Sequence, residues 1–478
     1  MRKATSSTRL LGLALCASSV VSADVVRHPL NVGVSLEQFQ FFHTTSNTKA
    51  GFPSPLLMVR PTGWVFGSAT VDDRLDLVFG LGATLFSIPP TDGVYPQGYQ
   101  NELYPAVALV QASGTYKWGD LNNPSLKATL GHLPYKYNPD AKNMGEYLLR
   151  STPYPNTVLN SPFDLVSSAQ ATVLGGILSK NFAGGKWKND LVLASSNTNY
   201  PMGDLSLAYI TSYRVHPILE VGAGVSFHRL IPMQSHNSSN ESGINAYFTH
   251  GGKKLAAGTS KDASGGYYGA TTAADTLIID AVYDSLLVKA PLPASVSDVG
   301  YYTFQGQMLM ARFALDFKPI LGATMAWKLY GEWAMLGVRN YPIFYEKPLE
   351  RMPMMLGLDI PTFGLLDMLN VEMEYWKNPF LNSGFGASYE GKATPYLDIL
   401  SYNQASLTST SQDLKDDDFS WSISATKSFG GAFSVTAKAA RDHAQVMQLN
   451  APTISKSYTD EMSGKKSWYY VLRAQVAI

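Results

Sequence analysis

The last twelve residues, Ser467-Trp-Tyr-Tyr-Val-Leu-Arg-Ala-Gln-Val-Ala-Ile478, alternate between two faces up to the end of the chain. One face carries Trp468, Tyr470, Leu472, Ala474, Val476 and Ile478, and the other carries Ser467, Tyr469, Val471, Arg473, Gln475 and Ala477. Because successive strand residues point to opposite sides, the stretch predicts a β-strand with one apolar face. Such a terminal strand needs a partner, and a closed barrel supplies one by pairing the last strand with the first.

The same period of two recurs along the chain and predicts about sixteen strands, with a range of about fourteen to eighteen. Most have about the 9–11 residues that a tilted strand needs to cross a bilayer. Besides 467–478, the expected strands cover residues 30–37, 62–71, 75–86, 105–117, 124–134, 166–180, 187–197, 204–216, 219–228, 302–317, 323–333, 351–361, 367–377, 415–428 and 433–445.

Connections between these strands alternate in length. Short ones are expected at 72–73, 118–123, 181–186, around 217, and at 318–320, 361–366 and 430–432. Between them lie longer segments at 43–61, 89–104, 135–165, 231–301, 338–350, 377–414 and 446–466, with a shorter one at 198–203. The pattern predicts an all-β fold, namely a transmembrane antiparallel up-and-down β-barrel with short periplasmic turns and long extracellular loops.

The N-terminus and the composition agree with export. Residues 1–23 have a basic start, a short apolar run and a small-residue cleavage site, so we expect a signal peptide followed by a barrel over 24–478. The only cysteine, Cys16, lies in that signal. Charged residues make up 15% of the chain, below the roughly 25% usual for soluble domains. The net charge of zero gives no reason to expect a nucleic-acid partner.

The terminal strand resembles the C-terminal signature of bacterial outer-membrane barrels, although it ends on Ile478 rather than on an aromatic residue. This resemblance implies a place in the outer membrane of a bacterium, with lipid and lipopolysaccharide as surroundings. It also implies recognition of the strand 467–478 by the barrel-assembly machinery.

The third long connection, 134–165, is the most distinctive local segment. Residues 134–150 mix aromatic and charged side chains with prolines, and Asp140–Arg150 is predicted as a short helix in which Glu146 pairs with Arg150. The architecture resembles that of the general porins, whose third loop folds into the channel and narrows it, and which often form trimers. The resemblance implies a constriction loop and a homotrimer. The candidate constriction residues are Lys136, Asp140, Lys142, Glu146, Tyr147 and Arg150.

Charged residues on the inward faces of the predicted strands are the candidate pore lining. They are Lys117, Lys127, Lys188, Arg214, Glu220, Arg312, Lys328, Glu332, Glu372 and Glu374. Both signs are equally represented on the inward faces, which predicts little charge selectivity. Inward glycines at 80, 82, 222 and 224 leave room for a loop against the wall. These features favour a porin-like channel for passive diffusion of small hydrophilic solutes.

Two other functions remain open on the sequence. A substrate-specific or hydrophobic-solute transporter would use Met308 and Met310, and a structural or adhesive surface barrel would act through its loops, above all the long loop 231–301. An enzyme is not expected, because the chain lacks a Gly-x-Ser-x-Gly motif, a phosphate-binding loop and a His-Glu-x-x-His motif. No cofactor is expected, and no metal site is expected.

Overall fold

A computed structural model gives the fold of the chain. It describes residues 24–42, 57–88, 102–121, 123–149, 158–159, 171–195, 205–231, 248–250, 253–254, 299–301, 306–322, 327–339, 341–342, 347–377, 419–442, 445–450, 455–460 and 468–478. The predicted signal peptide and most of the 231–301 loop therefore lie outside the described residues.

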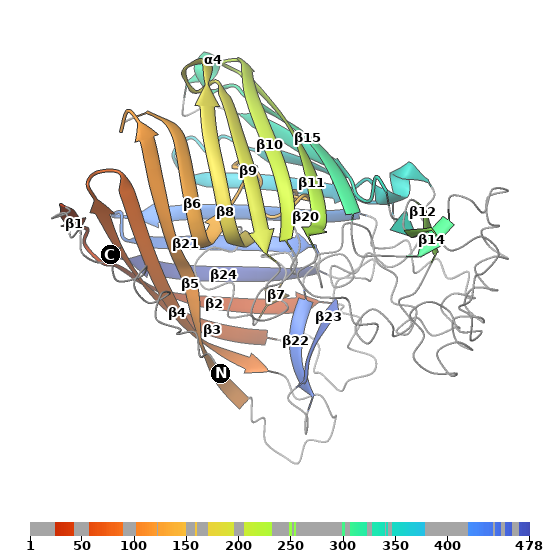
Figure 1. Cartoon of the computed structure of the whole chain (residues 1–478). Coiled ribbons are helices and arrows are strands. Elements are labelled where there is room, and N and C mark those ends of the chain that lie inside the picture. The colour runs from red at the N-terminus through yellow and green to blue at the C-terminus, as the bar shows by residue number, and fades with distance from the viewer. Residues whose placement is uncertain are drawn as a thin grey trace, which may run out of the picture.

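Antiparallel strands form one closed barrel (Figure 1). Its sheet has 17 strands. The short β1 (Val25–Arg27) pairs only with residues 69–71 at the end of β3, and the other 16 strands form the wall. The wall strands are β2 (Asn31–Phe42), β3 (Leu57–Val71), β4 (Leu75–Ile88), β5 (Glu102–Gly119), β6 (Pro124–Tyr135), β8 (Ala171–Phe182), β9 (Trp187–Ser195), β10 (Leu205–His216), β11 (Leu219–Ile231), β15 (Gly306–Asp316), β16 (Lys328–Met335), β18 (Met354–Asp359), β19 (Met368–Tyr375), β20 (Phe419–Phe429), β21 (Phe433–Arg441) and β24 (Trp468–Ala477).

Closure is made by the first and last wall strands. β24 pairs with β2 from Gly33 opposite Ala477 to Phe42 opposite Trp468, and Figure 1 shows the two strands side by side. The predicted barrel of sixteen strands is thereby confirmed, as is the role of the terminal strand. Short strands outside the wall form two small sheets, one from β12 (Phe248–His250), β13 (Lys253–Lys254), β14 (Val299–Tyr301) and β17 (Tyr341–Pro342), the other from β7 (Val158–Leu159), β22 (Gln445–Asn450) and β23 (Ser455–Asp460).

The tight turns in the described part of the chain lie at one end of the barrel, here called the short-turn end. Asp72 and Asp73 both have positive φ (49° and 57°), and so do Gly430 and Gly431 (62° and 82°). Two successive residues with positive φ form a turn whose twist matches the right-handed twist of the paired strands. Gly and Asp adopt positive φ more readily than most residues. The opposite end, where the longer connections begin, is here called the long-loop end.

One connection at the short-turn end differs from the prediction. The strand expected to begin at 323 begins at Lys328, and a short helix, α4 (Lys318–Leu321), occupies the expected turn. Pro319 lies in the first helical turn, where its missing N–H costs no hydrogen bond. Two 3₁₀ turns complete the described helical elements, η3 (Ala183–Gly185) and η6 (Pro348–Arg351).

The outer face of the wall is apolar. Along β2 the side chains of Val32, Val34 and Leu36 are exposed, whereas the alternating Ser35 and Glu37 are buried inside. Aromatic residues lie near the strand ends: exposed Trp118 packs edge-on against Tyr116 at the short-turn end, and half-buried Phe42 stacks on Trp468 at the long-loop end. Apolar residues between two aromatic girdles are the pattern of a wall that faces lipid.

None of the helices in the described part of the chain is long and apolar enough to cross a membrane.

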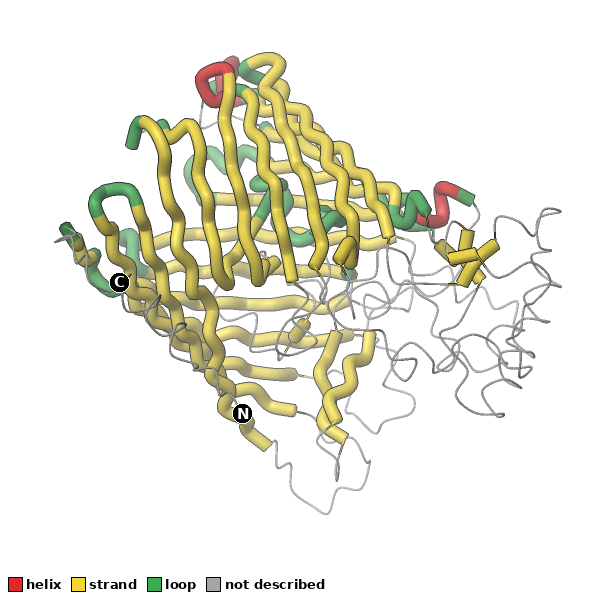
Figure 2. The backbone as a smooth tube through the Cα atoms, viewed as in Figure 1, coloured by secondary structure: helices red, strands yellow, loops and turns green. Residues whose placement is uncertain are grey.

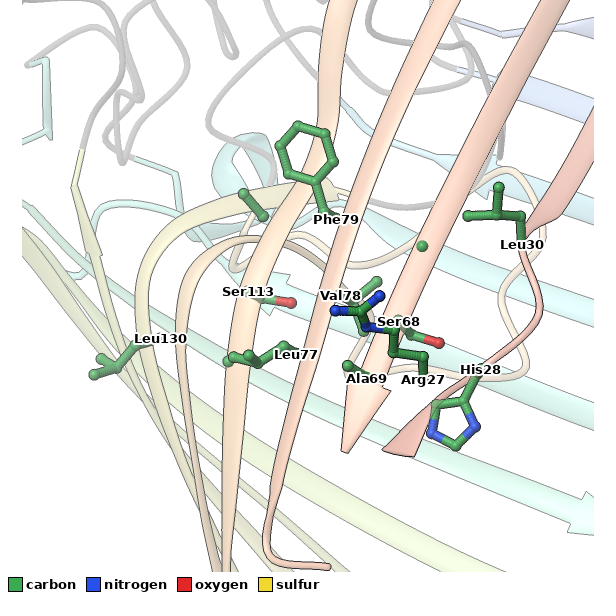
Figure 3. A pocket seen from close by; sticks show the side chains of 13 residues that line it. Arg27, His28, Leu30, Ser68, Ala69, Leu77, Val78, Phe79, Ser113 and Leu130 are labelled. Atoms are coloured by element: carbon green, nitrogen blue, oxygen red, sulfur yellow. The ribbon is translucent and has the colours of Figure 1, made fainter. Parts of the chain in front are cut away.

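A shallow pocket of about 600 Å³ interrupts this outer face (Figure 3). Its floor is made of small residues on β3 and β5, including Gly67, Ala69 and Gly114. Leu30 and Leu130 lie on opposite sides of the pocket. Because these side chains belong to the lipid-facing surface, the pocket lies outside the lumen.

Candidate functional site

Residues 136–149, here called the inner loop, leave the end of β6 and fold back into the barrel. All of them except Pro139 are buried or half-buried, and Figure 2 shows loop segments among the strands of the wall. The predicted helix over Asp140–Arg150 is wrong for the described part, because residues 140–149 form turns, bends and irregular backbone. Gly145 and Glu146 have positive φ (84° and 60°), which a right-handed helix does not allow. Arg150 lies outside the described residues.

Glu372 on β19 is the main anchor of the inner loop. Its Oε1 accepts the backbone N–H of Lys142 at 2.6 Å, and its Oε2 accepts those of Asn143 at 2.6 Å and Met144 at 3.0 Å. Three successive N–H groups thus enclose one carboxylate, an anion-binding backbone arrangement. The Tyr330 hydroxyl donates to the same carboxylate at 2.7 Å, and the Glu372 side chain is fully buried.

Two further glutamates hold the rest of the inner loop. Glu332 on β16 accepts the hydroxyl of Tyr137 at 2.6 Å, the amide of Asn138 at 2.7 Å and the backbone N–H of Tyr147 at 3.0 Å. Glu374 on β19 accepts the hydroxyl of Tyr147 at 2.7 Å. Burial raises the pKa of the Tyr137 phenol, so this group stays protonated as a donor.

Polar side chains of the inner loop complete the attachment. Asn143 donates to Asp442 at 2.7 Å and accepts from the ammonium of Lys438 on β21 at 2.5 Å. Asp140 forms an ion pair with Lys328 on β16. Within the loop, Glu146 accepts the backbone N–H of Asn138 at 3.0 Å. The Lys136 ammonium donates to the carbonyl of Ala141, and burial lowers the pKa of that ammonium.

The anchors place the inner loop across the full width of the barrel. Between β6 and β19 lie β8, β9, β10, β11, β15, β16 and β18 on one side, and β5, β4, β3, β2, β24, β21 and β20 on the other. β19 is therefore diametrically opposite the strand from which the loop departs. A loop held at both walls divides the lumen.

One arc of the interior is filled by apolar packing against the inner loop. Leu148 and Met144 of the loop belong to a cluster with Ile177, Val192, Ile210, Met308, Met310 and Met355 from strands of the β8–β18 arc. Polar groups lie on the inward face of the remaining arc, among them the cross-strand pairs Thr62–Thr84 and Thr426–Thr436, whose hydroxyl oxygens lie 3.1 and 3.0 Å apart. The inward face along β20, β21, β24, β2 and β3 is therefore more polar than that of the β8–β18 arc.

Gly224 on β11 is the position where the wall makes room for the loop. A Cβ at this residue would lie 2.5 Å from Cδ1 of Leu148, which is fully buried. We expect Gly224→Val to push the inner loop away from the wall, change the single-channel conductance and destabilise the barrel by about 1–3 kcal/mol. Conductance and thermal unfolding are the measurements. Gly63→Val is the control, because the nearest atom to a Cβ there is 3.8 Å away; equal effects of both variants would contradict the prediction.

A second group of charges lies where the barrel closes. Glu37 on β2 is 2% exposed and lies between Arg60 of β3 and Arg473 of β24, forming ion pairs with both. Arg60 Nε donates to Glu37 Oε2 at 2.7 Å. Glu37 therefore links the first, second and last wall strands from inside the barrel.

The other predicted lining residues lie toward the short-turn end. Lys117 pairs with Asp76 at 2.5 Å, and half-buried Lys127 is its cross-strand neighbour. Glu220 accepts from Arg312 at 2.7 Å, and Arg214 lies 3.9 Å from the same carboxylate. Lys188 is exposed on β9. These residues do not contact the inner loop through any bond seen in the described residues, whereas Lys328, Glu332, Glu372 and Glu374 do.

Sequence reasoning missed several residues of this site. Asn143, Tyr330 and Asp442 were not among the candidates, although each bonds to a candidate or to the inner loop. Arg60, the ion-pair partner of Glu37, was not among them either. Arg60 lies in the connection expected over 43–61, because β3 begins at Leu57 rather than at residue 62, so strand alternation was not applied to it. Asn143 lies in a connection, where no periodicity places it. Asp442 lies within the strand expected over 433–445, but β21 ends at Arg441, one residue before it. In the described part of the chain, no cluster of His, Cys, Asp and Glu is suited to hold a metal ion.

No protein-family model and no curated protein sequence matches this chain. Solved structures that it resembles include a double mutant of the Rh. blastica porin, at 8% identity and a TM-score of 0.40 over 95% of this chain and 100% of that one. Salmonella typhi OmpF in complex with daunomycin gives 8% identity and a TM-score of 0.44 over 94% of this chain and 97% of that one. By the strand pairing and closure described above, the chain has a general-porin-like architecture.

Proposed function

We propose that this protein is an outer-membrane channel through which small hydrophilic solutes diffuse passively. The observation that carries the proposal is the inner loop, which crosses the lumen and is bound to Glu332, Glu372 and Glu374 on the far side. A loop fixed by buried carboxylates narrows a wide barrel without sealing its more polar arc. The apolar outer face supports a position in a bilayer, and a barrel of this kind belongs in the bacterial outer membrane.

Pairing of the wall charges supports weak selectivity between simple monovalent ions. Glu37, Asp76, Asp140 and Glu220 each lie within ion-pair distance of a lysine or an arginine. Paired charges of opposite sign produce little net field at the scale of the whole channel. The residues proposed to line the constriction are those of the inner loop together with Lys438 and Arg473.

The hydrophobic-solute alternative finds less support. Met308 and Met310 are both 3% exposed and pack in the cluster that holds the inner loop, so they offer no open surface to an apolar solute. A structural or adhesive role would depend on the long loop 231–301, most of which lies outside the described residues. Lipid, lipopolysaccharide, the barrel-assembly machinery acting on 467–478 and a homotrimer remain proposed partners.

Replacing residues 138–149 by a short Gly-Ser linker tests the proposal. Without the inner loop the lumen widens, so we expect a larger single-channel conductance in planar bilayers and a larger size limit for sugars that block the current. The retained fold is checked by heat-modifiable migration and by β-sheet circular dichroism. A wild-type barrel that is folded but silent would overturn the channel proposal, and unchanged conductance in the loop-deleted barrel would overturn the constriction.

A further inference from the structure

The shallow pocket on the outer face of the wall, here called the outer pocket, is lined by β1, by residues that follow it, and by strands β3 to β6 (Figure 3). Its volume of about 600 Å³ falls within the range of roughly 300–1,000 Å³ that is usual for ligand pockets. None of its lining residues is acidic, and most of them are apolar. On a wall that faces lipid, such a recess is covered by acyl chains rather than by water.

Small and large side chains alternate along one row that crosses the strands of the outer pocket. The row runs from Arg27 on β1 through Ala69, Leu77 and Gly114 to Leu130 on β6, and each residue pairs in register with the next. Cross-strand partners point to the same side of a sheet, and the exposed leucines mark that side as the outer face. The small residues form the floor of the pocket, and Arg27 stands at one end of the row on the lipid-facing side.

Arg27 lies close to the short-turn end of the barrel. Its register partner, Ala69, is near the end of β3, just before the turn at Asp72 and Asp73. A cation on the lipid-facing side of a barrel is tolerated near the membrane interface far better than at the bilayer centre. The long arginine side chain extends its charged end toward the interface while its stem stays on apolar surface. The guanidinium of Arg27 is therefore at the level of the lipid head groups.

Arg27 lacks a counter-ion in the protein. Its side chain is exposed and forms no hydrogen bond or ion pair within the part of the chain that the structure describes. The neighbouring His28 is engaged, since its Nε2 lies 2.9 Å from Oγ1 of Thr70. A guanidinium presents five N–H donors in a planar fork that matches the oxygens of a phosphate. The outer pocket thus combines an apolar recess with one cation suited to a phosphate group.

We propose that the outer pocket binds one phospholipid, with the phosphate on Arg27 and an acyl chain across the small residues of the floor. Charge complementarity favours a phospholipid over a neutral lipid, because the phosphate diester is an anion and no lining residue is acidic. The short-turn end faces the periplasm in the proposed topology, so the lipid comes from the periplasmic leaflet. The inference goes beyond the proposed channel function and does not depend on it, because the pocket lies outside the lumen.

Native mass spectrometry of the protein released from detergent micelles tests the site. Palmitoyl-oleoyl phosphatidylglycerol and phosphatidylethanolamine are the probes, and palmitoyl-oleoyl glycerol, which lacks the phosphate, is the reference lipid. We expect one phospholipid per barrel at concentrations at which the reference lipid does not bind. Arg27→Gln is expected to weaken binding about fivefold, and Arg27→Lys, which keeps the charge, to retain most of it. Gly67→Ile is expected to weaken binding about tenfold, because its Cβ, 3.4 Å from Cδ2 of Leu30, starts a side chain that fills the recess.

Lys180→Gln is the matched control. Lys180 is also an exposed cation near the short-turn end, with its Nζ 4.9 Å from the ring centroid of Phe182, but it does not line the pocket. This variant is expected to bind phospholipid like the wild type, and heat-modifiable migration verifies that each variant is folded. Binding of only one of the two phospholipids would support the site and identify its head group.

Four results would overturn the inference. They are equal binding of the reference lipid, equal losses in Lys180→Gln and Arg27→Gln, preferential binding of lipid A, and a stable oligomer of this chain that dissociates in Gly67→Ile. The last result would assign the outer pocket to a contact between subunits. Planar-bilayer conductance of Arg27→Gln is expected to equal that of the wild type, and a silent wild-type barrel would overturn the channel proposal alone.

Discussion

Glu372→Ala is expected to release the inner loop from the wall and to raise the single-channel conductance and the sugar size limit of the barrel. The carboxylate accepts three successive backbone N–H groups of the loop, at 2.6 to 3.0 Å, inside a buried site. Each buried N–H left without an acceptor costs about 1–3 kcal/mol, so the attached state loses several kcal/mol. Planar-bilayer recordings will show the change as larger and noisier open currents.

Comparison with Glu372→Gln separates charge from shape. The amide keeps one acceptor oxygen but adds two donors facing the N–H groups, so we expect an intermediate conductance. Asp367→Asn is the control, because Asp367 also accepts a backbone N–H, that of Ser428 at 2.6 Å, but lies in an exposed turn. A barrel with Glu372→Ala that conducts like the wild type would show that the loop does not depend on this anchor.

Glu37→Ala is expected to cause a large loss of barrel stability. Without this carboxylate, Arg60 (1% exposed) and Arg473 face each other across the closing strands with their shared counter-ion removed. Breaking a buried ion pair by removing one partner costs about 3–5 kcal/mol, because it leaves an uncompensated charge. The measurement is urea unfolding of the protein in lipid vesicles, together with the temperature at which its heat-modifiable band is lost.

A double-mutant cycle with Arg473→Ala tests the origin of that loss. If Glu37 acts by holding the arginines, the double variant will be more stable than the sum of the two single losses predicts, because the repulsion between Arg60 and Arg473 is then absent. Lys427→Ala is the control, because it removes a more exposed ion pair, that of Lys427 with Asp367. Strict additivity, or a loss of stability in Glu37→Ala no larger than in Lys427→Ala, would contradict the proposed role of Glu37 in closing the barrel.

Local chemistry explains why the barrel could be predicted. In β2, Val32, Val34 and Leu36 alternate with inward residues, and the period of two assigns both faces without knowledge of any partner. The Asp72-Asp73 and Gly430-Gly431 turns were visible for the same reason, since the turn geometry selects the residue type. The helix expected over Asp140–Arg150 failed because the loop takes its conformation from the wall it contacts rather than from local propensity.

The sequence by itself determined the strands, their inward and outward faces, the tight turns and the pairing of the last strand with the first. Only the tertiary structure decided what the inward charges do. Glu372 lies 228 to 230 residues from the backbone groups it binds, and a pattern of local period contains no information on such a partner. Closure of sixteen strands brings β19 opposite β6. That geometry makes Glu332, Glu372 and Glu374 buried anchors of the inner loop.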